Sequence, residues 1–151
     1  MLNPVLVERV AQLLSKKLTL FTRLRDYSKE QQTISYFQDE STYNNLATQK
    51  EKTIAEITKL DVVLSKYLGK DEELTDSRPD FKASCDQYNQ EILSLAKEAL
   101  ELERLTKSKL TAELREVKSK LHQLRAGRKG AIGYIKAHRI NNSGAYTSSL
   151  R

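Results

Sequence analysis

The sequence is poor in the residues that close compact folds and in the signals that direct a chain to a membrane. Among its 151 residues there are no Trp, one Cys, two Pro and five Gly. A single cysteine excludes an internal disulfide and favours a reducing compartment. No apolar run approaches the roughly 20 residues of a membrane-spanning helix. Residues 2–14 are apolar on one face only, with no small-residue cleavage site after them, so no secretory signal is expected. We therefore expect a soluble, cytoplasmic protein.

The sequence also lacks a pattern typical of catalysis, of metal binding or of cofactor binding. His122 and His138 stand far apart, and neither has Cys or His at ligand spacing. Cys85 has no neighbouring His that would activate a thiol. The carboxylates of residues 98–103 alternate with Lys and Arg, as on a solvated helix face. The glycines of residues 127–133 lack the phosphate-loop spacing and follow a helix instead of a strand. We expect neither an enzyme nor a bound cofactor.

What the sequence does contain is long helical segments. It is 38% apolar and 30% charged, and residues 79–124 hold no Gly and no internal Pro. Asn3-Pro4 is a typical helix start, Gly69 a typical helix stop, and the segment Asp39–Thr42 a new cap. We predict an all-α fold, an elongated antiparallel bundle or coiled coil of about three helices with one long C-terminal helix. The helices are expected at about residues 3–39, 43–68 and 79–126, forming a bundle over 1–126, and a flexible basic tail over 127–151.

Each predicted helix carries a seam of residues spaced by alternating steps of four and three, the spacing of helices that pack along one another. Polar side chains interrupt every seam. In the first helix the seam is Leu6, Val10, Leu13, Lys17, Leu20, Leu24, Tyr27, Gln31 and Ile34. In the second it is Leu46, Lys50, Thr53, Ile57, Leu60, Leu64 and Tyr67.

The third helix offers two stripes in its first half and one narrow seam in its second half. The first stripe is Ile92, Leu95, Ala99 and Leu102, and the second is Leu93, Ala96 and Leu100, followed by Glu103 and Lys107. Two adjacent stripes predict packing against two helices. The late seam consists of Leu110, Leu114, Val117, Leu121 and Leu124. It either packs on the other two helices, or forms an open surface for a partner's amphipathic helix or for self-association.

Positive charge is concentrated at the C-terminal end. The net charge is +6, but residues 115–151 hold nine Lys and Arg against one acid, whereas the preceding residues sum to −2. Such an end is typical of proteins that bind nucleic acid, an anionic membrane surface or an acidic protein. Candidate docking residues there are Arg128, Lys129, Tyr134 and Tyr146. A solvated end without a function is the alternative.

Several segments resemble flagellar type III export chaperones of the FlgN family, with FliT as a close cousin. They are Leu24-x-x-Tyr27 with Lys29-Glu30-Gln31, the segment 46–52 leading into Ile54-x-x-Ile57-x-x-Leu60-Asp61, and the segment 128–134. The sequence departs from the family in having Arg125 or Arg128 where an Asn-Leu pair is expected. It is also more basic than most members.

The resemblance implies a small cytoplasmic chaperone that binds helical C-terminal segments of flagellar hook-associated proteins and delivers them to the export gate or its ATPase. It implies that the late seam holds the client, and that a tail tyrosine, Tyr134 or Tyr146, docks on the export platform beside Arg128 and Lys129. Two other functions remain open. One is a coiled-coil scaffold, including a homodimer, and the other, which we favour least, is a nucleic-acid-binding protein that uses the basic tail.

Overall fold

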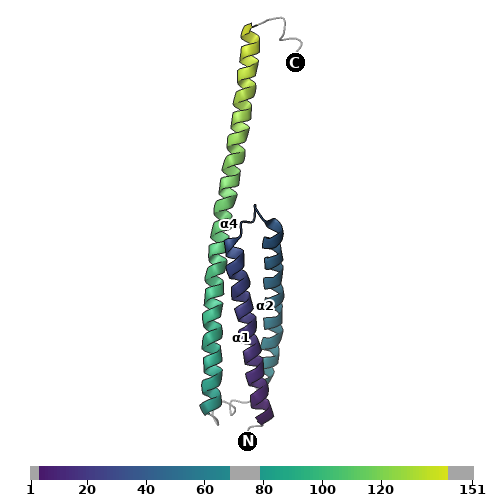
Figure 1. The fold of residues 1–151 in the computed structure, drawn as a ribbon, viewed down its shortest axis with the longest axis vertical. Coiled ribbons are helices and arrows are strands. Elements are labelled where there is room, and N and C mark those ends of the chain that lie inside the picture. The colour runs from purple at the N-terminus through teal and green to yellow at the C-terminus, as the bar shows by residue number, and fades with distance from the viewer. Residues whose placement is uncertain (1–3, 69–78, 143–151) are drawn as a thin grey trace. The chain divides into compact units, whose positions relative to one another are not determined.

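The computed structural model describes residues 4–68 and 79–142, with side chains as far as residue 136. These residues form three helices and no strand: α1 is Pro4–Thr33, α2 is Glu40–Leu68 and α4 is Pro79–Asn142 (Figure 1). The predicted all-α class with a long C-terminal helix is confirmed. The chain divides into two compact units, Met1–Leu110 and Thr111–Arg151, instead of at residue 126 as predicted. Each unit is described by itself.

The break between the first two helices lies earlier than predicted. α1 ends at Thr33 instead of near residue 39, because residues 34–39 form a turn in which the N–H of Asp39 donates to Ser35 O at 2.9 Å. Asp39 caps α2 as the sequence indicates: its Oδ1 accepts a hydrogen bond from the N–H of Thr42 at 3.2 Å. α2 therefore begins at Glu40 and not at residue 43.

The predicted seams of α1 and α2 form the core of the first unit. The two helices run antiparallel and are the most closely packed pair (Figure 1). Val10, Leu13 and Leu20 are buried on α1, and all six seam residues of α2 from Leu46 to Leu64 are buried. Removing an aliphatic side chain of this size from water stabilises the fold by about 1.5–3 kcal/mol.

Only one of the two early stripes of α4 is buried. Ile92 and Ala99 are buried, together with Cys85 and Phe81, about two and three turns before Ile92, and these last two join the α1–α2 core. Leu93 and Leu100, from the second stripe, are 55% and 72% exposed. The expectation that both stripes are covered was wrong. The first part of α4 lies against the hairpin with one face, and the adjacent face stays in solvent.

The prediction that the long helix ends near residue 126 was also wrong. α4 continues to Asn142, through Gly127, Gly130 and Gly133, all with ordinary negative φ. Glycine costs a helix about 1 kcal/mol relative to alanine, but it does not forbid helical dihedrals. The interspersed Ala and basic residues are good helix formers. Residues 143–151 of the expected tail lie outside the described part of the chain.

Candidate functional site

The late seam of α4 is exposed along most of its length. Leu114, Leu121 and Leu124 are 42%, 48% and 69% exposed, whereas Leu110 and Val117 are half-buried. Leu110 is the last residue of the first unit, and the other four residues belong to the unit Thr111–Arg151. Of the two interpretations of the seam, the open one agrees with this exposure. Exposed leucines in one line are the type of surface that proteins use for association.

The apolar line continues beyond the predicted seam. Because α4 stays helical after Leu124, the same four-and-three spacing passes through Arg128 and Ala131 to Ile135, with Ile132 beside it. Ile132 and Ile135 are about 44% and 45% exposed. Sequence reasoning missed this continuation, because it ended the helix before these residues. The apolar line therefore extends beyond Leu124 to Ile135, but Arg128 interrupts it.

Positive charge borders the seam. Lys118, Lys120 and Arg125 are exposed next to it, and the Nζ of Lys120 lies 3.0 Å from the Glu116 carboxylate one turn earlier. An exposed ion pair such as Lys120–Glu116 contributes little to stability. Upstream of these residues, Glu113 is half-buried. From Lys118 to Lys136 every residue is exposed. The seam thus presents a narrow apolar line between mostly basic edges.

The predicted docking residues lie on the same helix, not in a coil. Tyr134 is 71% exposed, and Arg128 and Lys129 are exposed. Successive residues of an α-helix are about 100° apart, so Tyr134 does not point along the line of Ile135. Like Lys120 before Leu121, it lies at the edge of the extended apolar line, beyond Leu124, the last residue of the seam. Tyr146 falls outside the described residues.

A second concave surface lies within the first unit, and sequence reasoning did not find it. It is a groove of about 490 Å³ lined by residues of α1, α2 and α4. Small side chains, Ala47 on α2 and Ala96 and Ala99 on α4, leave space open between the helices. Ile54 and Leu100, which also line the groove, are large, exposed apolar residues. The signal available in the sequence was the alanines at or beside seam positions.

A polar layer lies at one end of this groove. Lys50 is a charged residue at a seam position and is only 8% exposed. Its Nζ donates to Gln31 Oε1 at 2.5 Å and also pairs with the Glu103 carboxylate, while Gln31 Nε2 donates to Tyr43 O at 3.2 Å. The polar residues that interrupt the three predicted seams thus meet one another. Lys17, the other interruption in α1, pairs with Asp61 of α2 at 2.6 Å.

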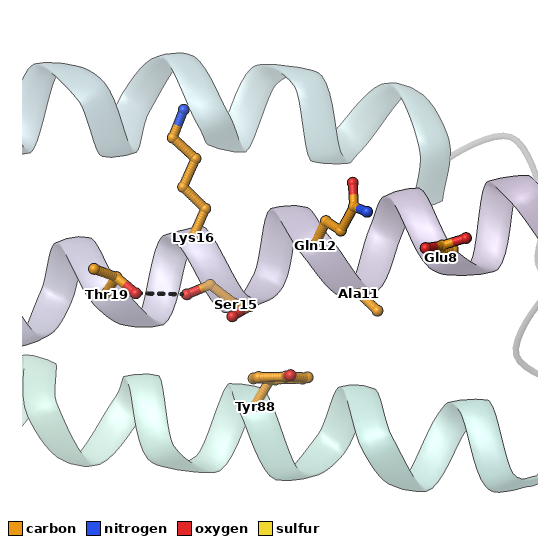
Figure 2. A pocket seen from close by; sticks show the side chains of 7 residues that line it. All are labelled: Glu8, Ala11, Gln12, Ser15, Lys16, Thr19 and Tyr88. Atoms are coloured by element: carbon orange, nitrogen blue, oxygen red, sulfur yellow. Dashed lines mark hydrogen bonds between the residues drawn. The ribbon is translucent and has the colours of Figure 1, made fainter.

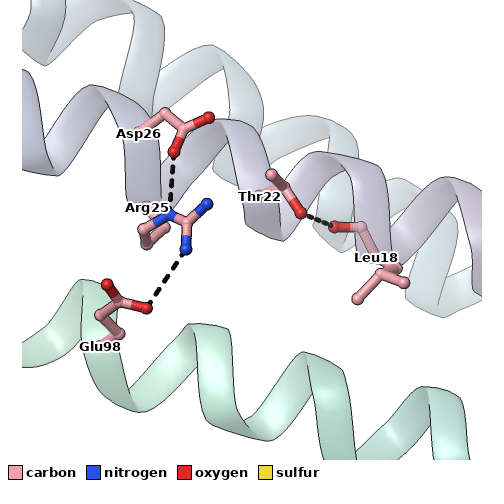
Figure 3. A network of polar contacts seen from close by, with 5 residues as sticks. All are labelled: Leu18, Thr22, Arg25, Asp26 and Glu98. Carbon is pink, nitrogen blue, oxygen red and sulfur yellow. Dashed lines mark hydrogen bonds and ion pairs between the residues drawn. The ribbon is translucent and has the colours of Figure 1, made fainter.

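Polar contacts made by long side chains join α4 to α1. Figure 3 shows Arg25 between Asp26 of its own helix and Glu98 of α4, at 2.8 Å and 3.4 Å. The hydrogen bond to Asp26, with a smaller one to Glu98, raises the pKa of the Arg25 guanidinium. Further along, Lys109 Nζ donates to the Gln32 carbonyl at 3.1 Å. These contacts are made by long side chains, which suits a helix set further from the α1–α2 pair.

Another depression on the bundle is lined mostly by polar side chains. It measures about 440 Å³ and lies between α1 and Tyr88 of α4, whose ring is directed towards α1 (Figure 2). The hydroxyl of Thr19 donates to the backbone carbonyl of Ser15 at 3.1 Å, so it is already bonded within its own helix. Glu8 and Lys16 at its edge are exposed, as surface side chains are. The arrangement offers no convergent polar groups for a ligand.

No catalytic arrangement is found among the described residues. Within residues 4–68 and 79–136 no three His, Cys, Asp or Glu side chains could hold a metal ion. Cys85 is buried, and this burial, helped by the nearby Asp86, raises the pKa of its thiol, which disfavours the reactive thiolate. The pKa of Glu101 is lowered by the hydrogen bond from Arg104, a surface pair one turn apart. In the same part of the chain no helix is long and apolar enough to cross a membrane.

Comparisons of the chain with protein-family models, with curated proteins and with solved structures found no match.

Proposed function

We propose that the protein is a helix-binding chaperone, whose client segment lies along the late seam of α4. The observation that carries the proposal is the exposure of Leu114, Leu121 and Leu124 at the spacing of a coiled-coil interface. A partner with the same spacing would cover this narrow line, and a narrow line suits reversible binding. Such a partner is an amphipathic helix of another protein. A second copy is disfavoured, because it would bring two basic edges together.

The proposal extends to flagellar type III export, with hook-associated proteins as clients. The support for this finer assignment is the resemblance of residues 24–31, 46–61 and 128–134 to chaperones of the FlgN kind. An amphipathic helical end of a filament protein has an apolar face that would self-associate before export. Covering this face in the cytoplasm and releasing it at the export gate would require a seam of limited strength.

Delivery is proposed to depend on residues beyond the seam. Tyr134 is exposed and lies beyond Leu124, the last residue of the seam, so it can contact the export machinery while the seam holds a client. A tyrosine supplies an apolar ring with a polar tip for such a contact. Arg128 and Lys129 would speed the encounter with an acidic surface on the gate or its ATPase, an effect that falls as salt rises.

The experiment is a binding titration with purified C-terminal segments of hook-associated proteins. Leu114→Asp with Leu121→Asp should abolish binding, because it places two charges in the apolar line. The matched control is Leu100→Asp, the same change at an exposed leucine on the groove of the same helix. It should leave binding unchanged. Urea unfolding of each variant should match that of the wild type, since these leucines are not in the core.

Other outcomes would redirect the assignment. Loss of binding with Leu100→Asp alone would move the client to the groove between α2 and α4. Unfolding of the Leu114/Leu121 variant would mean that the seam is part of the core. A molar mass that grows with concentration, and that stops growing in this variant, would favour the scaffold function. Tyr134→Ala should retain the client and weaken a pull-down of the gate's cytoplasmic domain, and the reverse result would exchange the two roles.

A further inference from the structure

We infer that the helix bound by the late seam carries acidic side chains along the edges of its own apolar stripe. This inference rests on the proposed function, that the seam binds a helix. It concerns the chemical class of the partner, which the apolar spacing alone does not specify. The observation behind it is the identity of the charged residues at the positions that border Leu114, Val117, Leu121 and Leu124.

The coiled-coil register defines these bordering positions. With Leu114 and Leu121 as one set of core positions and Val117 and Leu124 as the other, two edges flank the line. One edge holds Lys118 and Arg125, and the other holds Glu113 and Lys120. Lys118, Lys120 and Arg125 are exposed, whereas Glu113 is half-buried at the upstream end. From Val117 onwards, therefore, both edges of the seam are positive.

A second copy of the chain does not complement these edges. In a parallel pair, Lys120 would face Arg125 of the other copy, and the two Arg128 side chains would meet at a core position. Both contacts are repulsive. The contact between Glu113 and Lys118 would be attractive. In an antiparallel pair, equivalent edges of the two copies face each other, so Lys118 and Arg125 of one copy would lie against Lys118 and Arg125 of the other. Like charges at such positions destabilise a helix pair. Acidic residues on a different protein would turn each of these contacts into an attraction.

An anionic membrane is a weaker candidate for the same surface. Helices that lie in a lipid interface present a broad apolar face rich in Trp, Phe or Leu. Residues 111–136 contain no Trp or Phe, and their apolar line covers only the two core positions of each heptad, with charge on both sides. The width and spacing match a helix, and the sign of the edges calls for acidic residues on it.

The test uses the full-length protein and three synthetic helical peptides with identical Leu core positions. The peptides differ only at the two edge positions of each heptad, which are Glu, Gln or Lys. In fluorescence anisotropy at low salt, the Glu peptide should bind about five- to tenfold tighter than the Gln peptide, and the Lys peptide weakest. The difference should shrink at about 0.5 M salt, because screening acts on exposed charges.

Charge reversal identifies the residues responsible. Lys118→Glu with Arg125→Glu should reverse the order of the Glu and Lys peptides. The matched control is Lys52→Glu with Lys59→Glu, two exposed lysines at the same seven-residue spacing on α2, which should keep the original order.

Two failures can be told apart. Equal affinity for all three peptides would overturn the acidic partner and leave helix binding intact. If no peptide binds, and anionic vesicles or DNA bind the wild type but not the charge-reversal variant, both the acidic partner and the proposed function are wrong. A molar mass that increases with concentration in the wild type and not in the charge-reversal variant would overturn the argument against a second copy.

Discussion

Polar residues that interrupt an apolar seam are informative when the structure shows what they meet. Gln31, Lys50 and Glu103 come from three different helices and form one hydrogen-bonded layer. A buried polar layer can be satisfied in one alignment of the helices only, and a shift by one turn would leave Lys50 without its partners. We propose that this layer fixes the register of α4 on the α1–α2 pair, a role that buried polar residues have in some coiled coils.

Lys50→Met tests the importance of this layer for stability. The variant removes the ammonium group, leaving the Gln31 carbonyl oxygen buried without its donor and Glu103 without its counter-ion. We expect the free energy of unfolding in urea to fall by about 2 kcal/mol. Adding Glu103→Leu should recover most of this loss, because two apolar side chains replace the broken pair.

Lys17→Met is the control for that experiment. The Lys17–Asp61 pair joins α1 to α2, and its side chains are 19% and 48% exposed. Its loss leaves a half-exposed carboxylate that water can solvate, whereas loss of the Lys50 ammonium also leaves the buried Gln31 oxygen without a donor. The expected loss is below about 1 kcal/mol. If Lys50→Met were no more destabilising than Lys17→Met, the layer would have no special role in the bundle.

At the scale of the element, α4 combines two kinds of helix in one continuous segment. Up to Leu110 it is supported by burial of Phe81, Cys85, Ile92 and Ala99. In the unit that follows, its described side chains are exposed or half-buried, so helix propensity and local charge pairs have a larger share in its stability. The three glycines are the weakest points of this part by propensity.

Replacing Gly127, Gly130 and Gly133 with Ala should therefore stabilise the end of α4. A Cβ at any of the three positions meets nothing within 4 Å, so the methyl groups add no clash. Each substitution should favour the helix by about 1 kcal/mol. Amide hydrogen exchange over residues 127–136 should slow, and the far-ultraviolet helical signal should rise. Ala126→Gly with Ala131→Gly should have the opposite effect, and unchanged exchange in both variants would contradict the helix assignment there.

At the scale of the whole molecule, the two units differ in how they are stabilised. The buried apolar residues of the described chain all lie before Thr111, and the last buried residue of any kind is Thr106. A chain of residues 1–110 keeps the α1–α2 core, Phe81, Cys85 and the polar layer. It loses Leu114, Leu121 and Leu124 of the seam.

We expect the 1–110 fragment to unfold cooperatively in urea with a midpoint near that of the full chain, because no core side chain has been removed. It should fail to bind the client segment and the acidic peptide. Circular dichroism and the same anisotropy titration provide both measurements. A fragment that fails to fold would show that residues after Leu110 contribute to the core. A folded fragment that still binds would assign the client to the groove lined by Ala96 and Leu100.

The sequence by itself determined the local features of the fold. The four-and-three spacing identified the buried residues of α2 and most of those of α1, without Leu14 and Ser28. Asp39, Pro79 and the residues near Gly69 marked helix ends, because periodicity and capping depend on neighbouring residues along one helix. The five seam residues from Leu110 to Leu124 were recognisable for the same reason. The low helix propensity of glycine, also a local signal, led to a wrong end for α4, because glycine lowers the stability of a helix without ending it.

Only the tertiary structure decided which of several equivalent surfaces is used. α4 offers two apolar stripes in its first half, and the position of the other helices buries Ile92 and Ala99 while exposing Leu93 and Leu100. The meeting of Lys50 with Glu103, 53 positions apart, depends on how α2 and α4 are aligned. Burial is a property of the space around a helix, and one helix's own sequence does not contain it.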